Sequence, residues 1–143
     1  AMNFGAKQYE RVRKAFKYNV RVGTVFMSVS AVILYVFARE FTEVLSRNED
    51  VINIAVDMLR IQCLTLPFMA YFATGSMYMQ NIGRYYTALI ISISRQGIFY
   101  IPALFLLTLS LGQKGLYMVQ PVADVLAFLL TAAVVRKKGL EYK

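Results

Sequence analysis

Two charged side chains lie inside long apolar runs, and they are the first candidates for chemistry in this sequence. Asp124 lies in the middle of residues 116–135, and Arg95 lies about a third of the way along residues 85–111. A charge at the centre of a bilayer costs roughly 3 kcal/mol or more, so it needs a partner or a purpose. The chemistry open to this pair is a structural ion pair between two helices, or a part for Asp124 in cation or proton coupling.

The two charges are expected at a similar depth. Arg95 lies eleven residues after Arg84, and Asp124 lies twelve residues before Arg136. At ~1.5 Å rise per residue, each is about 16–18 Å from the basic end of its helix. An ion pair is therefore feasible if the two helices are adjacent and antiparallel. We favour helix locking over ion coupling as the interpretation, because a basic partner is available at matching depth.

Further polar residues lie on the same helix as Asp124. At spacings of three, four and seven they share one helical face: Tyr117, Gln120, Asp124 and Thr131. Pro121 adds a polar group to this helix, because its ring nitrogen cannot donate and the carbonyl of Tyr117 is left free. Gln120 is thus a candidate intramembrane polar residue, together with Arg95 and Asp124.

Membrane-spanning helices are the elements that must position these residues. Of the 143 residues, 58% are hydrophobic and 17% are charged, and the mean hydropathy is +0.50. A soluble domain would carry more charge. The charges separate four apolar runs, each long enough to cross about 30 Å of hydrocarbon, near residues 18–37, 51–81, 85–111 and 116–135. The sequence predicts an all-α polytopic membrane protein, with four transmembrane helices in a single domain over residues 1–143.

Local signals refine these helices. Prolines are expected to introduce a hinge or kink at Pro67, Pro102 and Pro121, because each removes a backbone hydrogen bond. Asn48, followed by two acidic residues, is typical of a helix start. Residues 111–115 are predicted to form a short turn between the last two spans.

The distribution of charge predicts the orientation. Basic residues gather before the first span and after the last, whereas residues 39–57 are mainly acidic. By the positive-inside rule both termini are expected in the cytoplasm, with the spans in the inner or plasma membrane. The formal charge of +8 fits anchoring to an anionic leaflet better than binding to nucleic acid.

Residues 69–80 are the best candidate for a cavity wall. They mix methionine, aromatic and hydroxyl side chains, which suit an adaptable binding surface. Ordinary helix packing explains the same composition equally well. The candidate cavity residues are Met69, Tyr71, Thr74, Met77 and Gln80.

Other chemistries find little support. The sequence has no histidine and one cysteine, so it indicates neither a transition-metal site nor an internal disulfide. No nucleophile, paired acids or metal-ligand set indicates an enzyme. We expect no cofactor, apart from Na⁺ or H⁺ as a coupling ion.

Several short segments, taken in order, resemble one family. Residues 3–12 (Asn-Phe-Gly-Ala-Lys-Gln-Tyr-Glu-Arg-Val) resemble the segment after the second helix of either half of multidrug and toxic compound extrusion (MATE) transporters. Residues 80–83 are similar to the Gln-x-x-Gly that ends the fourth helix of a half, and residues 95–96 to an Arg-Gln pair on the fifth. Residues 120–124 resemble the Gln-Pro-x-x-Asp of the sixth.

The resemblance implies twelve helices in two six-helix lobes, and export of organic cations or metabolites in exchange for sodium or protons. This chain would supply the last four helices of the second lobe, and it would be inactive alone because alternating access needs both lobes. Its partners would be the lipid bilayer, the remaining helices of the transporter and small organic cation substrates. Two alternatives stay open: a self-associating membrane assembly or binding protein, and a lipid or polysaccharide flippase of the wider superfamily.

Overall fold

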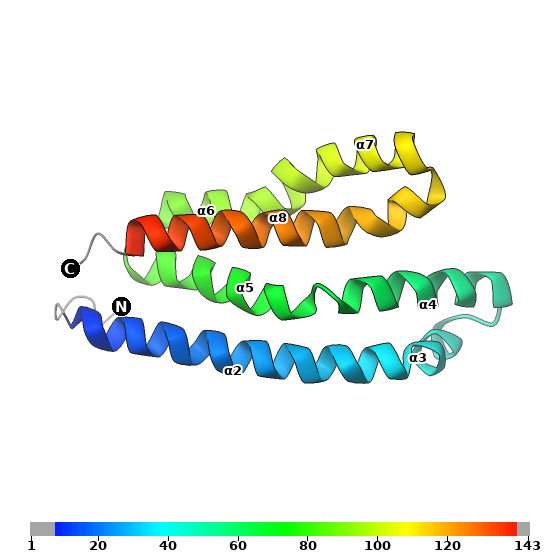
Figure 1. Ribbon diagram of the computed structural model, residues 1–143, viewed down its shortest axis with the longest axis horizontal. Helices are drawn as coiled ribbons and strands as arrows, with labels where there is room; N and C mark the ends of the chain where they lie inside the picture. The colour runs from blue at the N-terminus through cyan, green and yellow to red at the C-terminus, as the bar shows by residue number, and fades with distance from the viewer. Residues whose placement is uncertain (1–7, 140–143) are drawn as a thin grey trace.

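The computed structural model describes residues 8–139, and these form helices with no β-strand among them (Figure 1). The elements are α2 (Tyr9–Val36), α3 (Ala38–Leu45), α4 (Glu49–Cys63), α5 (Leu66–Asn81), α6 (Tyr85–Ile93), the π-helix η1 (Ser94–Phe99), α7 (Tyr100–Leu111) and α8 (Gln113–Gly139). The predicted all-α fold is confirmed. The start of α2 and the end of α8 lie at the same end of the molecule (Figure 1).

Membrane-spanning length is reached by three continuous helices and one broken helix. The continuous ones are Tyr9–Val36, Tyr85–Leu111 and Gln113–Lys137. Helices α4 and α5 are long and apolar enough to cross a membrane only when they are taken together. They are bent by 54° at the break between them. The chain is thus a multi-pass membrane protein, with the broken pair in the position of the second predicted span.

The three prolines act in different ways. Pro67 lies in the first turn of α5, after the break that follows Cys63. Proline is tolerated there because the first N–H groups of a helix have no partner within the helix. Pro67 therefore starts a new helix rather than kinking an intact one. Pro102 lies in the first turn of α7, directly after η1, whereas α8 continues through Pro121.

The turn between α7 and α8 is shorter than the sequence predicts. Residue Gly112 alone separates the two helices, with φ 59 and ψ −133, a conformation open to glycine. The prediction that residues 113–115 belong to the turn was wrong. Gln113 and Lys114 are good helix formers, and once Gly112 has reversed the chain nothing prevents them from starting α8.

The start of α4 is confirmed as predicted. The side-chain oxygen of Asn48 accepts hydrogen bonds from the backbone N–H groups of Asp50 at 3.0 Å and Val51 at 3.4 Å. Two of the N–H groups that a helix start leaves open are thereby satisfied, and the acidic first turn complements the helix dipole.

Replacing Asn48 with alanine should lower the free energy of unfolding by about 1 kcal/mol, because both cap hydrogen bonds are lost. Asn53→Ala is a matched control: it makes the same chemical change at an exposed position inside α4. Thermal unfolding in detergent would measure both. Equal melting temperatures for the two variants would contradict a capping role for Asn48.

Helix α2 packs against α4 and α5, α5 packs against both α6 and α8, and α7 packs against α8 (Figure 1). A cluster of buried side chains joins α5, the turn after it, α6 and α8: Met79, Ile82, Ala88, Ile91 and Val135. Burial is uneven across this arrangement. One third (33%) of the apolar window of α8 is buried, against 6% of that of α2. Helix α8 is therefore the internal helix, and α2 presents most of its surface outward.

Candidate functional site

The structure brings Arg95 and Asp124 together. The Nε atom of Arg95 lies 2.6 Å from Oδ1 of Asp124, a charge-assisted hydrogen bond between η1 and α8. The Asp124 side chain has no exposed surface, and the Arg95 side chain keeps 21% of its surface exposed. The predicted equal depth of the two charges in antiparallel helices accounts for this contact.

Three uncharged side chains complete the surroundings of the carboxylate. Gln120 donates its side-chain N–H to Oδ1 at 2.9 Å. On the other oxygen, Oδ2 accepts from the side-chain amide of Gln62 at 2.9 Å and faces the hydroxyl of Thr65 at 3.3 Å. Since the Thr65 hydroxyl also lies 3.0 Å from the carbonyl of Gln62, its single proton can serve only one of these acceptors at a time.

Irregular backbone surrounds this cluster, which we call the Asp124 network (Gln62, Thr65, Arg95, Gln120 and Asp124). Two of its members, Gln62 at the end of α4 and Thr65 in the break that follows, lie where the broken second span is bent by 54°. The Arg95 side chain comes from the π-helix, and Asp124 follows the proline of α8. π-Helical turns re-aim side chains and are frequent at functional sites. Three irregular helices are thus joined through one carboxylate.

The Asp124 network suits an ion pair better than a bound metal cation. Its partners present N–H or O–H donors to the carboxylate, one of them a guanidinium. A sodium or magnesium ion requires several oxygen ligands instead. Within residues 8–139 there is also no group of three or more His, Cys, Asp or Glu side chains placed to hold a metal ion.

Part of this network was predicted from the sequence. The prediction included Arg95, Gln120 and Asp124, but it also placed Thr131 on the same polar face. The structure buries Thr131 and satisfies its hydroxyl within α8, where it donates to the carbonyl of Ala127 at 2.7 Å. Gln62 was missed, although a polar amide within an apolar run, close to a proline, was a usable signal.

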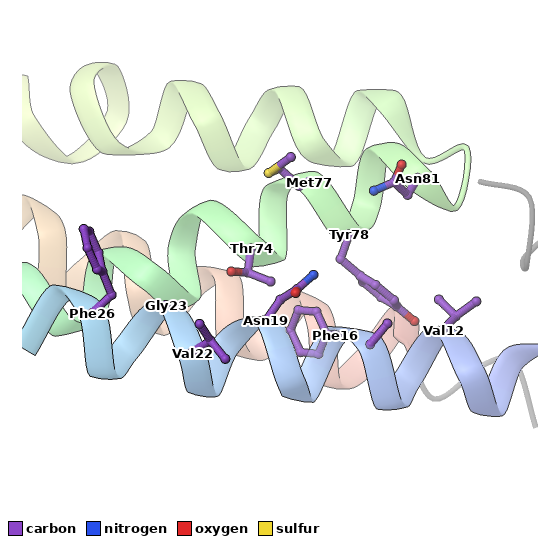
Figure 2. Close-up of a pocket in the computed structure, with 11 residues that line it drawn as sticks. Val12, Phe16, Asn19, Val22, Gly23, Phe26, Thr74, Met77, Tyr78 and Asn81 are labelled. Carbon is purple, nitrogen blue, oxygen red and sulfur yellow. The ribbon is translucent and has the colours of Figure 1, made fainter.

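A groove between α2 and α5 is the second candidate feature. Its volume is about 570 Å³, and the side chains that line it are uncharged. Figure 2 shows residues of α2 facing residues of α5 across it, among them Phe16, Asn19, Phe26, Thr74, Met77 and Tyr78. The rings of Phe16 and Tyr78 lie 4.9 Å apart, centre to centre. The groove therefore offers aromatic faces, a thioether and the polar groups of Asn19, Thr74, Tyr78 and Asn81.

Two of the five predicted cavity residues, Thr74 and Met77, line this groove, and the other three do not. Tyr71 packs its ring against Phe16 and Phe128, with centroid distances of 5.9 and 5.3 Å. Met69 and Gln80 do not line the groove. At about 100° per residue, they lie roughly 120–140° around α5 from Thr74. Composition alone could not select the right face.

Comparisons with known proteins agree with this architecture. The family model described as MatE matches residues 1–106. A solved structure titled "protein A" is similar to this chain, with 31% sequence identity and a TM-score of 0.86. That match covers 94% of this chain and 30% of the other, so this chain spans less than a third of its length. No curated protein matches the sequence. The family-model match extends over well more than half of the residues, and the chain belongs to the MatE family of multidrug and toxic compound extrusion transporters.

Proposed function

We propose that this chain supplies membrane-spanning helices of an antiporter that exports small organic cations or metabolites in exchange for sodium or protons. The observation that carries the proposal is the family match over residues 1–106. Alternating access moves two repeats or bundles against each other around a central site. The chain covers 30% of the solved structure that it resembles, so we infer that it needs the remaining helices of the transporter and is inactive alone.

The proposed location is the inner or plasma membrane, with both termini in the cytoplasm. Basic residues support this orientation, since they cluster at the end of the molecule where α2 starts and α8 ends (Figure 1). They are Arg11, Arg13, Lys14, Lys17, Arg136 and Lys137.

Within the transporter, we assign different roles to the two candidate features. The Asp124 network holds α4, α5, η1 and α8 in one arrangement, because its charge is matched by donors from each side. The groove between α2 and α5 is the candidate substrate contact. Its aromatic rings could face an organic cation, an attraction worth about 0.5–2 kcal/mol per ring when water is excluded. Met77 can adapt its shape to different substrates.

A chimera tests the proposed function. This chain would replace the corresponding helices of a full-length MATE transporter, and ethidium efflux would be measured in an efflux-deficient bacterial strain. The expected result is efflux that stops when the sodium or proton gradient is collapsed, and no efflux from the 143-residue chain alone. A chimera that reaches the membrane in normal amounts without exporting ethidium would contradict the proposal. Robust efflux by this chain alone would contradict its incompleteness.

One observation favours a second candidate, self-association. Only 6% of the apolar window of α2 is buried, so this helix has surface available for another copy of the chain. Light scattering in mild detergent distinguishes the two functions. A discrete dimer or tetramer would support an assembly protein, whereas a monomer would favour a transporter part that lacks its partner helices.

A further inference from the structure

Helix α3 follows the first span after a single non-helical residue, and its side chains divide into three faces. The first face packs on α4. Ala38 and Thr42 are buried there, and Ala38 forms a small core with Ile52 and Val56. The Thr42 hydroxyl lies within hydrogen-bonding distance of the carbonyls of Ala38 and Arg39, at 3.0 and 2.9 Å. This face fixes the position of α3 against the second span.

The second face is charged. Arg39 donates from Nε to Glu43 at 2.7 Å and from Nη2 to Glu49 at 3.2 Å, which links α3 to the first turn of α4. The hydrogen bond to Glu43, with the charges of Glu49 and Glu43, raises the pKa of Arg39 above its ordinary value. Glu40 lies next to this group on the same helix. Such a face belongs in water or among lipid head groups.

The third face is apolar and open. Phe37, Phe41, Val44 and Leu45 follow the spacing i, i+4, i+7 and i+8, which places them along one side of a helix. The exposed fractions of these four residues are 50%, 47%, 86% and 86%, respectively. Three large apolar residues facing outward on an eight-residue helix, with Phe37 directly before it, need a nonpolar surrounding.

The open face continues an exposed apolar surface of α2. Near the end of α2, Val32 and Val36 are 63% and 59% exposed on a helix long and apolar enough to cross the membrane. Figure 1 shows α3 at the end of α2 opposite to its start, turned away from the line of the spans. Eight helical residues reach about 12 Å, too short to cross the hydrocarbon core. The helix therefore begins where the apolar span of α2 ends.

We propose that α3 is an interfacial helix whose apolar face, formed by Phe37, Phe41, Val44 and Leu45, inserts into the boundary between lipid head groups and acyl chains. Its partner is the bilayer itself. Interfacial helices bury their apolar face about 5–10 Å into this boundary and keep the charged face outside. Through Ala38 and Thr42 the inserted helix would fix the depth of α4. This inference does not depend on what the protein transports.

The absence of tryptophan from the sequence makes a direct test available. Val44→Trp introduces a unique fluorophore on the apolar face, and Glu43→Trp is the matched control on the charged face. The full chain would be reconstituted in phosphatidylcholine–phosphatidylglycerol vesicles, with and without bromine on the acyl chains near the head group. We expect brominated lipid to quench Val44→Trp several-fold more than Glu43→Trp, and aqueous acrylamide to show the reverse order.

A second variant, Leu45→Trp, should behave like Val44→Trp, since both side chains lie on the same exposed face and neither substitution disturbs a buried contact. Strong acrylamide quenching of both, without quenching by brominated lipid, would overturn the proposal by placing the face in water. Protection from both quenchers would overturn it as well, because a protein surface would then cover α3.

Discussion

Replacing Asp124 with asparagine should lower the free energy of unfolding by about 3–5 kcal/mol, because the change leaves the Arg95 cation without its partner. The carboxylate accepts from Arg95, Gln120 and Gln62 through two oxygens. An amide has one accepting oxygen, and its NH₂ group would face an existing donor. The buried thiol of Cys63, the only cysteine in the sequence, provides the measurement: a thiol-reactive dye reports its exposure as the protein is heated in detergent.

Asp57→Asn is the control for this prediction. It makes the same change on an exposed residue of α4, so the free energy of unfolding should stay within about 0.5 kcal/mol of the parent. If Asp124→Asn melted at the same temperature as Asp57→Asn, the Asp124 network would not stabilise the bundle.

The second large effect is expected where Gly75 of α5 packs against Thr131 of α8. A Cβ atom added at Gly75 would overlap Cγ2 of Thr131, and both residues are buried. Gly75→Ala should therefore lower the free energy of unfolding by about 1–3 kcal/mol, the usual cost of overpacking a core. This loss of stability is expected even though alanine has a higher helix propensity than glycine. The thiol-exposure measurement would show it as a lower melting temperature.

Thr131→Ser provides the matching rescue, because serine keeps the hydroxyl that donates to Ala127 and lacks the overlapping methyl group. Alone it should cost about 0.8 kcal/mol for the lost methyl. Combined with Gly75→Ala it should restore most of the stability, since the new Cβ takes the vacated space. If the stability losses of the two single variants simply added in the double variant, the overlap with the Thr131 methyl group would not be the cause of the destabilisation.

Much of the fold was predictable because membrane proteins obey simple constraints on length and charge. The bilayer thickness selects the apolar runs, and the helical rise placed Arg95 and Asp124 at equal depth before any contact was known. The cap at Asn48 was readable for a similar reason, since the interaction reaches only two or three residues along the chain. Features set by interactions between neighbouring residues, or by the thickness of the bilayer, can therefore be predicted from the sequence.

The remaining features depend on contacts between segments far apart in the chain. Gln62 meets Asp124 across 62 positions, and no local pattern pairs them. The π-helix at residues 94–99 also escaped prediction, because an apolar run has the same composition in an α-helix and in a π-helix. Thr74 and Met77 were separable from Met69 and Gln80 only after α2 had docked on one face of α5.

A double-mutant cycle between Arg95 and Asp124 tests the central claim most directly, namely that one buried ion pair joins η1 to α8. The free energy of unfolding would be measured for the parent chain, Arg95→Gln, Asp124→Asn and the double variant. Each single change leaves the other charge unpaired, whereas the double variant leaves two amides that can bond to each other. We predict a coupling energy between Arg95 and Asp124 of roughly 1–3 kcal/mol, with the double variant more stable than Asp124→Asn alone. Additive losses, with a coupling energy near zero, would contradict it.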